Sequence, residues 1–365
     1  MLFRSFGERR RARGVAILTS LAVALALAGP AMADTPPPHA QRRLRVATYN
    51  LYLGADLTPL LDKSGLELID AAATAWAHVK ATDFRIRAEA IADLIVEERP
   101  HLVGLQEVAL WQTAPLTNPA ALTTRFDFLQ LLLDELDERG ARYETAVENP
   151  HLVAALPVST RKLVRFTERN AIIARTDLDE ETFAVSAPVS ITFRARVPVT
   201  INGQPFAITR GYAIVDAQFR GKWIRFATAH LEAYSDLIRK LQAQELVAAL
   251  ASSQYDVILS GDLNSYREWA GDSHAIFTAA GYTDVWTETM PGAPGYTASF
   301  GDDLVGPPSE LDHTVDYVMR SSGGTLDGVD DEGEVIGDEV DDRTSTGWWL
   351  SDHAGIAVTV QIVKV

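Results

Sequence analysis

Residues 102–107 read Leu-Val-Gly-Leu-Gln-Glu, a short apolar run that ends in polar side chains. The run predicts a buried strand, and Glu107 follows directly after it. Upstream, residues 84–98 carry apolar side chains at helical spacing, and Pro100 ends that helix. The stretch therefore predicts a helix followed by a buried strand, with a carboxylate at the end of the strand.

Strands and helices are interspersed along the rest of the chain in the same way. We expect further helices at residues 126–138 and 237–251, and further strands at residues 44–49, 171–174, 183–185, 191–199, 206–219, 223–231, 257–260 and 314–319. Asn202-Gly203 and Arg220-Gly221-Lys222 are typical of hairpin turns between three of these strands. Because no long linker or repeat divides the chain, we predict one α/β domain rich in antiparallel strands.

The first 33 residues have the order of a secretory signal peptide. Five arginines within residues 1–14 precede an almost wholly apolar run at residues 15–28, and Ala31-Met32-Ala33 offers a cleavage motif. The run is shorter than the roughly 20 residues that a membrane-spanning helix needs, so an uncleaved anchor is the less favoured interpretation. We therefore expect a signal peptide at 1–33, a Pro-rich flexible leader at 34–42, a folded domain at 43–365, and secretion.

The composition limits the chemistry of the protein. Its 365 residues include no cysteine, which excludes disulfides, thiolate metal sites and a cysteine nucleophile. The formal net charge is −16, and loss of the signal peptide's five arginines and one glutamate would lower it to −20. An acidic chain is unsuited to holding nucleic acid by charge alone, but it can still bind a phosphate ester through a divalent metal ion.

Polar side chains occur at the ends of the predicted buried strands, where their removal from water needs a reason. They are Asn50, Glu107, His230, Asp262, Asn264, Asp316, Asp352 and His353. Each residue taken alone is compatible with a turn or a structural hydrogen bond. Together they supply the carboxylates, amides and imidazoles that metal-assisted attack of water on a phosphate ester requires.

The strings that contain these residues resemble the motifs of the endonuclease/exonuclease/phosphatase superfamily, to which DNase I belongs. The matching strings are Thr48-Tyr49-Asn50-Leu51, Leu105-Gln106-Glu107-Val108, Thr228-Ala229-His230-Leu231, Gly261-Asp262-Leu263-Asn264-Ser265, Val315-Asp316-Tyr317-Val318 and Ser351-Asp352-His353. They occur in the family's order and span residues 48–353. The resemblance implies an α+β fold, a four-layer αββα sandwich in which two packed mixed sheets are flanked by helices and the site lies at the strand ends.

The resemblance also implies a metal site. Asn50 and Glu107 would hold the metal, Glu107 directly, and Asp352 would add a further carboxylate. The implied ion is Mg2+, with Mn2+ as a possible substitute, because hard divalent ions prefer carboxylate oxygen.

The other matching residues are expected to act on the phosphate and on the attacking water. His230 would bind a phosphate oxygen, while Asp262 and Asn264 would position the nucleophile and the phosphate. His353, held by Asp316, would serve as general base or as a phosphate-binding imidazole. The choice of general base between Asp262 and His353 stays open.

Two departures from the family's pattern bear on the substrate. The middle strand region reads Glu168-Arg169-Asn170 and lacks the active-site tyrosine of AP endonucleases, which weakens that interpretation. Asn170 or Arg169 is expected to face the phosphate there. Glu232 stands where neutral sphingomyelinases typically carry glutamine, which counts mildly against a close sphingomyelinase.

Four further segments each allow two interpretations. Trp348-Trp349 would stack on a base, a sugar or a lipid interface, or pack in the core, which we expect for at least one ring. Residues 151–158 would form a membrane-touching lip or a buried hairpin. The basic residues at 161–169 would receive an anionic substrate or form a solvated strand face. The acidic residues 321–347 would bind calcium or form a solvated hairpin, and the hairpin is favoured.

The sequence favours a secreted Mg2+-dependent phosphoesterase that hydrolyses phosphodiester bonds in nucleic acid or in phospholipid head groups. A phosphomonoesterase of the inositol-phosphate type is the alternative with the same chemistry, and a non-catalytic binding or effector module is the alternative on the same scaffold. The expected partner is the phosphate-ester substrate, with transient contact to a membrane surface and no obligate protein partner.

Overall fold

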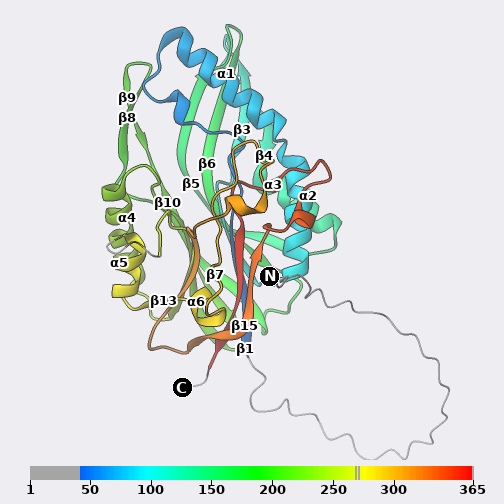
Figure 1. Cartoon of the computed structure of the whole chain (residues 1–365), viewed down its shortest axis with the longest axis vertical. Helices are drawn as coiled ribbons and strands as arrows, with labels where there is room; N and C mark the ends of the chain where they lie inside the picture. The colour runs from blue at the N-terminus through cyan, green and yellow to red at the C-terminus, as the bar shows by residue number, and fades with distance from the viewer. Residues whose placement is uncertain (1–41, 268, 270–271, 364–365) are drawn as a thin grey trace, which may run out of the picture. The chain divides into compact units, whose positions relative to one another are not determined.

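The computed structural model describes residues 42–363 except 268, 270 and 271 (Figure 1). The predicted signal peptide and, apart from Arg42, the predicted leader lie outside the described residues. Within the described part of the chain, no helix is both long enough and apolar enough to cross a membrane.

The larger sheet has eight strands. Its order is β15-β16-β1-β2-β6-β3-β4, and β5 pairs with β6 as well. The strands are β1 (Arg42–Asn50), β2 (Leu102–Gln106), β3 (Leu110–Pro115), β4 (Thr123–Asp127), β5 (Tyr143–Pro157), β6 (Lys162–Arg175), β15 (Leu326–Ile336) and β16 (Gly355–Ile362). Because β1 is parallel to β2 and antiparallel to β16, the sheet is mixed.

The smaller sheet has six strands in the order β13-β14-β12-β11-β10-β7. They are β7 (Phe183–Thr192), β10 (Gly211–Phe219), β11 (Lys222–His230), β12 (Asp256–Asp262), β13 (Tyr282–Asp284) and β14 (Asp316–Ser321). β11 and β12 are parallel and the other neighbours are antiparallel. β8 (Val197–Ile201) and β9 (Gln204–Ile208) form a separate hairpin around Asn202-Gly203, and both predicted hairpin turns are confirmed.

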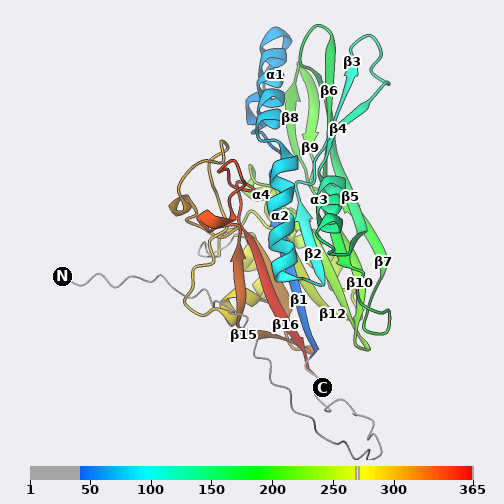
Figure 2. The same ribbon diagram turned by 90° about the vertical axis from the view of Figure 1, so that its right-hand side faces the viewer.

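Helices cover the outer faces of both sheets. α2 (Phe84–Glu98) and α3 (Phe128–Glu138) share a core with the larger sheet, and α4 (Asp236–Leu250) and α5 (Ser273–Ala279) share one with the smaller sheet (Figures 1 and 2). A third core of buried side chains, including Val46, Ile172, Val215, Phe226 and Val358, lies between the sheets. The expected four-layer αββα sandwich is therefore confirmed.

The remaining helical segments lie in the connections. They are α1 (Gly65–Ala81), α6 (Val285–Thr289) and the short 3-10 turns η1 (Thr58–Leu60), η2 (Pro308–Glu310) and η3 (Val340–Asp342). α1 was not predicted, although its buried residues Leu68, Ala72, Trp76 and Val79 have helical spacing. Its many alanines leave only a thin apolar stripe, which is why the periodicity is weak.

A polar layer joins the two sheets directly beneath the strand ends. Gln106 Nε2 donates to Thr228 Oγ1 of the smaller sheet at 2.8 Å, and Gln106 Oε1 accepts from Thr48 Oγ1 at 3.2 Å. A Cβ atom on Gly104 would lie only 2.3 Å from Ser260 Oγ and 2.4 Å from Thr228 Oγ1. Glycine is therefore required at position 104 for the sheets to approach this closely, and that approach brings residues of both sheets into one site.

Several segments differ from their predictions or settle an open choice. The predicted strand 206–219 is two strands, β9 and β10, because the chain breaks pairing at residues 209–210. Residues 151–157 belong to β5, which turns back into β6 as a hairpin. Residues 326–336 of the acidic segment form edge strand β15 rather than a free hairpin excursion. Trp349 is fully buried and stacks on Phe300 at 4.0 Å, which confirms that one ring of Trp348-Trp349 packs in the core.

Candidate active site

Two groups of acidic and histidine side chains meet where strands of both sheets end. The glutamate cluster comprises Glu107, Glu168 and His230, and the aspartate cluster comprises Asp262, Asp316 and His353. In each cluster the possible ligand atoms lie within 4.8 Å of one another. His230 Nε2 lies 3.4 Å from Asp262 Oδ2, so the two clusters are contiguous.

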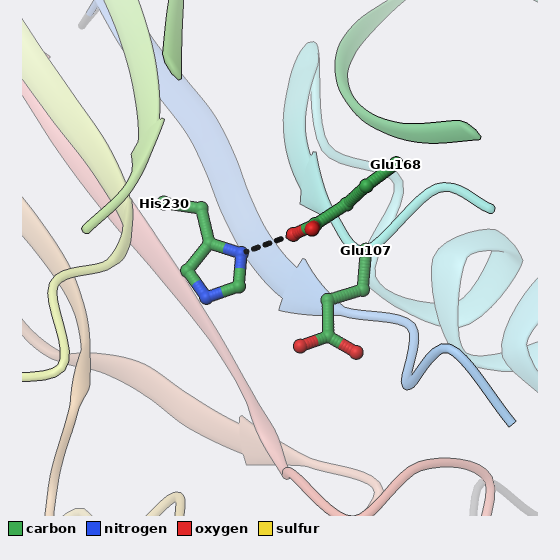
Figure 3. A group of neighbouring side chains, drawn as sticks. All are labelled: Glu107, Glu168 and His230. Atoms are coloured by element: carbon green, nitrogen blue, oxygen red, sulfur yellow. Dashed lines mark ion pairs between the residues drawn. The ribbon is translucent and has the colours of Figure 1, made fainter. Parts of the chain in front are cut away.

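The glutamate cluster joins residues of two strands, β6 and β11, with the residue that follows β2. Figure 3 shows Glu168 of β6 turned toward His230 at the end of β11, with Glu107 beside the pair. Glu168 Oε1 lies 3.2 Å from His230 Nδ1. Glu107 follows β2 with a backbone φ of 53°, and its carboxylate accepts a hydrogen bond from the Leu53 N–H at 2.7 Å. Left-handed backbone is costly for a glutamate, and such strain is found where a side chain must be aimed at a functional site.

Glu168 is surrounded by positive or polar partners. Arg210 pairs with its carboxylate, and His151 Nε2 lies 3.4 Å from Glu168 Oε1. Burial alone would raise the pKa of Glu168, but Arg210 and His151 together hold it well below its usual range. Burial and the neighbouring Arg210 lower the pKa of His230. The pair is therefore a carboxylate beside a neutral imidazole at neutral pH.

The aspartate cluster has the opposite electrostatics. Asp262 ends β12 directly opposite Asp316 of β14, and Asp316 Oδ2 lies 2.8 Å from His353 Nδ1. Burial alone would lower the pKa of His353, but the Asp316 and Asp352 carboxylates raise it well above its usual range. His353 is therefore a cation at neutral pH in the metal-free protein.

Asn50 and Asn264 are both fixed by hydrogen bonds. Asn50 Nδ2 donates to Asp262 Oδ2 at 3.0 Å, and its Oδ1 accepts from the Tyr52 N–H at 3.0 Å. Asn264 Nδ2 donates to the Leu231 carbonyl at 2.9 Å, and its N–H donates to Asp262 Oδ1 at 2.9 Å. Both amides thus hold the loops that carry the aspartate and histidine side chains.

Arg87 of α2 ties two of these loops together from below. Its guanidinium is fully buried and donates to the carbonyls of Leu51 at 2.6 Å, Leu350 at 2.8 Å and Tyr52 at 3.1 Å. Burial lowers its pKa to about 10, so the group stays charged at neutral pH. Arg87 therefore joins the segment after Asn50 to the segment before Asp352.

The carboxylates of the site, of which Asp316 is buried and Glu107 and Asp352 are half-buried, fit a divalent cation. Burial, Asp352 and Glu168 raise the pKa of Glu107 to about 8, and burial raises the pKa of Asp352. Asp316 Oδ1 is buried and has no hydrogen-bond partner among the described residues. Acids that repel one another at close range, together with an unsatisfied buried oxygen, are the surroundings that a hard oxygen-binding cation stabilises. Glu107, whose pKa the nearby Asp352 carboxylate raises, and the aspartate cluster with its unsatisfied Asp316 Oδ1 are therefore the places suited to hold such an ion.

The middle strand region corrects one expectation. Arg169 points away from the clusters, because its Nε donates to the Val108 carbonyl at 2.9 Å and its other nitrogens pair with Asp127 and Glu148. Side chains alternate along β6, so Glu168 and Asn170 occupy the opposite face. Asn170 Nδ2 donates to the Gly211 carbonyl at 2.8 Å, and its buried Oδ1 lacks a hydrogen-bond partner among the described residues.

The structure thus brings nine of the ten predicted residues into or beside the two clusters. The residues that sequence reasoning missed are Glu168, Arg210, His151 and Arg87. A signal for Glu168 was present, since it stands two residues before Asn170 and shares its strand face. Of the basic residues at 161–169, Arg161 and Lys162 are exposed near the β5–β6 turn.

Known proteins share the sequence motifs and the fold of this chain. The model of the Endonuclease/Exonuclease/phosphatase family matches residues 47–353. An endonuclease/exonuclease/phosphatase family protein of Bacteroides thetaiotaomicron has a similar structure, with a TM-score of 0.58, 16% identity and coverage of 89% of this chain and 99% of that one. A mannosyl-6-phosphatase of the same species gives a TM-score of 0.55 at 16% identity, covering 87% and 99% of the two chains.

A third similar structure is an endonuclease/exonuclease/phosphatase protein of Beutenbergia cavernae, with a TM-score of 0.54 and 18% identity. The alignment covers 88% of this chain and 72% of that one. No curated protein sequence matches the chain. At these identities the structural likeness establishes the fold alone, while the family model spans all the strings from Asn50 to His353.

Proposed function

The chain belongs to the endonuclease/exonuclease/phosphatase family, and we propose that it is a Mg2+-dependent phosphodiesterase that acts outside the cytoplasm. As a member of this family it is a phosphoric ester hydrolase. The observation that carries the proposal is the position of the Asp262 carboxylate. Its Oδ2 accepts a hydrogen bond from Asn50 at 3.0 Å. The same oxygen lies 3.4 Å from His230 Nε2 and 4.0 Å from His353 Nε2.

These positions suit attack of water on a phosphate ester. We assign Asp262 to accept the proton of the attacking water, because its carboxylate is buried between both imidazoles. We assign His353 to bind a phosphate oxygen as a cation, because its raised pKa makes it a poor base at neutral pH. The neutral His230 would donate a hydrogen bond to a second phosphate oxygen.

The metal-side residues complete the proposed site. A divalent ion held by Glu107, Asp352 and Asn50 would neutralise the negative charge that develops on the phosphate. Arg87 would keep the segments that bear Asn50 and Asp352 at a fixed separation, since it binds backbone carbonyls of both. Gln106 would likewise keep the two sheets at a fixed separation, since its side chain donates to Thr228 of the smaller sheet.

Hydrolysis of a chromogenic ester tests this proposal. We expect the purified protein to cleave bis-p-nitrophenyl phosphate with Mg2+ or Mn2+ and to lose this activity in EDTA. Glu107→Gln should lower kcat/KM by roughly 100- to 1,000-fold, the size of effect seen when one stabilising group of a transition state is removed. Plasmid DNA and phospholipid vesicles, assayed in parallel, distinguish the two substrate classes.

The controls separate the outcomes. Asp312→Asn changes an exposed acid near the site and should leave the activity as it is. Full turnover in EDTA would contradict the metal requirement. Cleavage of p-nitrophenyl phosphate but of no diester would make the protein a phosphomonoesterase, and cleavage of neither ester would contradict the enzyme assignment.

Export is the second part of the proposal and rests on residues 1–33. Five arginines, an apolar run and Ala31-Met32-Ala33 support it. N-terminal sequencing of the protein recovered from outside the cytoplasm should begin near Asp34. Recovery of the uncleaved chain from the cytoplasm alone would contradict export.

A further inference from the structure

An apolar groove lies beside the glutamate cluster. α1 and the η1 segment form one wall, and β3, β5 and β6 form the other. The lining includes Leu57, Leu60, Trp76, Trp111, Leu156 and Phe166, and every described side chain around the groove is apolar. Figures 1 and 2 both show α1 beside the ends of β5 and β6.

The groove continues from the site along a single strand face. Phe166 and Glu168 are alternate residues of β6 and therefore point to the same side of the sheet. At about 3.3 Å per residue, Phe166 begins roughly 7 Å along the strand from Glu168. Trp111 of β3 stands opposite Phe166, and their rings stack at 4.5 Å. A molecule whose phosphate contacts the glutamate cluster would therefore reach this groove with its next few atoms.

A hydrogen-bonded link also connects the groove wall to the site. Trp111 Nε1 donates to the Leu53 carbonyl at 3.0 Å, and the Leu53 N–H donates to Glu107 Oε2 at 2.7 Å. The backbone of one residue thus holds both a groove-lining ring and a metal-side carboxylate. The groove is part of the same rigid assembly as the catalytic clusters.

The lining selects the chemistry of the occupant. The indole N–H of Trp111 is already used by Leu53, which leaves the indole N–H of Trp76 as the one other polar group among the described lining side chains. A nucleobase or a sugar carries several hydrogen-bonding groups, and most of them would lose their hydrogen bonds to water there without replacement, which is costly. An alkyl chain would lose none. The cavity volume of about 50 Å3 is several times the space that one water needs, which suits a short stretch of narrow chain.

The charge of the chain favours a substrate with few phosphates. The formal net charge of the chain is −16, with Asp56 directly before Leu57 and the basic Arg161 and Lys162 at the turn between β5 and β6. A net negative charge repels a polyanion more strongly than it repels an ester with a single phosphate. Resting on the proposed function, we infer that the substrate is an amphiphilic phosphate ester whose alkyl tail lies in the groove between α1 and strands β3, β5 and β6.

A series of p-nitrophenyl alkyl phosphates tests this inference. Methyl, butyl, hexyl and octyl esters, kept below their micelle concentrations, should show kcat/KM rising with tail length until the groove is filled. The upper bound is roughly fourfold for each added methylene, the value for complete transfer out of water. A flat series would overturn the inference, and it would leave the phosphodiesterase proposal intact because the methyl ester would still be cleaved.

Two matched variants on β5 locate the effect. Ala154 stands opposite Phe166 and lines the groove, whereas Val153 is its neighbour on the other face and is 46% exposed. Ala154→Leu should fill the groove and remove the dependence on tail length, while Val153→Leu should retain it. Equal tail dependence in both variants would overturn the inference.

Binding of octyl phosphate gives a readout without turnover. Calorimetry should show tighter binding of octyl phosphate than of methyl phosphate to the wild-type protein, and Ala154→Leu should abolish the difference. If the methyl ester is not cleaved at all, the proposed function fails, and the calorimetric comparison still decides the groove. Equal binding of octyl and methyl phosphate to the wild-type protein would overturn the groove assignment independently.

Discussion

The site contains two carboxylate–imidazole pairs of similar geometry and opposite electrostatics. Glu168 lies 3.2 Å from His230, and Asp316 lies 2.8 Å from His353. Burial would lower the pKa of either imidazole. For His230 the neighbouring Arg210 lowers it further, whereas for His353 the Asp316 and Asp352 carboxylates raise it well above its usual range. The charge of each imidazole therefore depends on its surroundings: Arg210 adds to burial at His230, whereas the partner Asp316, together with Asp352, outweighs burial at His353.

The difference gives the two histidines separate roles in the proposed chemistry. A cationic His353 attracts a phosphate oxygen, while a neutral His230 can donate one hydrogen bond without adding charge. Asp262 lies between them and contacts both. Removal of the Asp316 carboxylate should therefore affect the charge of His353, and removal of the Arg210 guanidinium should affect the charge of His230.

The largest effect is expected from breaking the Asp316–His353 pair. Asp316→Asn removes the carboxylate that contributes most to keeping His353 protonated and that orients its ring, so kcat should fall by about 100- to 10,000-fold. Steady-state kinetics with saturating Mg2+ measures this. Asp312→Asn breaks the neighbouring exposed Asp312–His313 pair and is the matched control. A loss smaller than tenfold in Asp316→Asn, with an unchanged circular dichroism spectrum, would refute the role of the pair.

An intermediate effect is expected from removing the cation of the other pair. Arg210→Gln removes the guanidinium that lowers the pKa of His230, so His230 should become protonated at a higher pH. The acidic limb of the pH–rate profile should move upward, and activity at pH 6 should fall by roughly tenfold for each unit of that shift. Arg225→Gln removes an ion pair with Asp216 on the same sheet and is the control. An unchanged acidic limb in Arg210→Gln would show that Arg210 does not set the charge of His230.

The smallest effect is on stability and concerns Glu107. Its pKa of about 8 lies above the usual value of 4.5, so the folded protein keeps a proton that the unfolded chain releases. The free energy of unfolding of the metal-free protein should therefore decline as pH rises from 4.5 to 8, and Glu107→Gln should decline less. Thermal unfolding in EDTA at pH 5 and pH 8 measures the difference, which we expect to be a few degrees in Tm. Parallel profiles for the two proteins would contradict the raised pKa.

Part of the site and most of the fold could be predicted from the sequence. The strand-end residues Asp262, Asp316 and His353 stand out because each polar group interrupts or follows an apolar run. α2 was predicted with its bounds at residues 84–98, since one apolar stripe and a proline define it. The sandwich itself was implied by the order of the motifs, and the sheets then place distant motifs at one end.

The glutamate cluster was harder to predict. Glu168 lies inside the 14-residue strand β6 rather than at its end, so its only signal is the strand face that it shares with Asn170. Asn170 or Arg169 was expected to face the phosphate, and strand alternation places Asn170 on the face of Glu168 and Arg169 on the opposite face. Arg210 falls in the break between β9 and β10, where the sequence reads as one strand. The groove combines residues from η1, α1, β3, β5 and β6, and only the fold brings these together.

Nuclear magnetic resonance titration of the histidine rings tests the central claim most directly. In metal-free, 15N-labelled protein at pH 7, His353 should be an imidazolium and His230 should be neutral, with assignments made from His353→Asn and His230→Asn. In the Arg210→Gln variant, the titration midpoint of the His230 ring should rise, and that of the His353 ring should stay the same. Two rings that titrate together near pH 6.5 would contradict the claim that Arg210 keeps His230 neutral while Asp316 and Asp352 keep His353 charged.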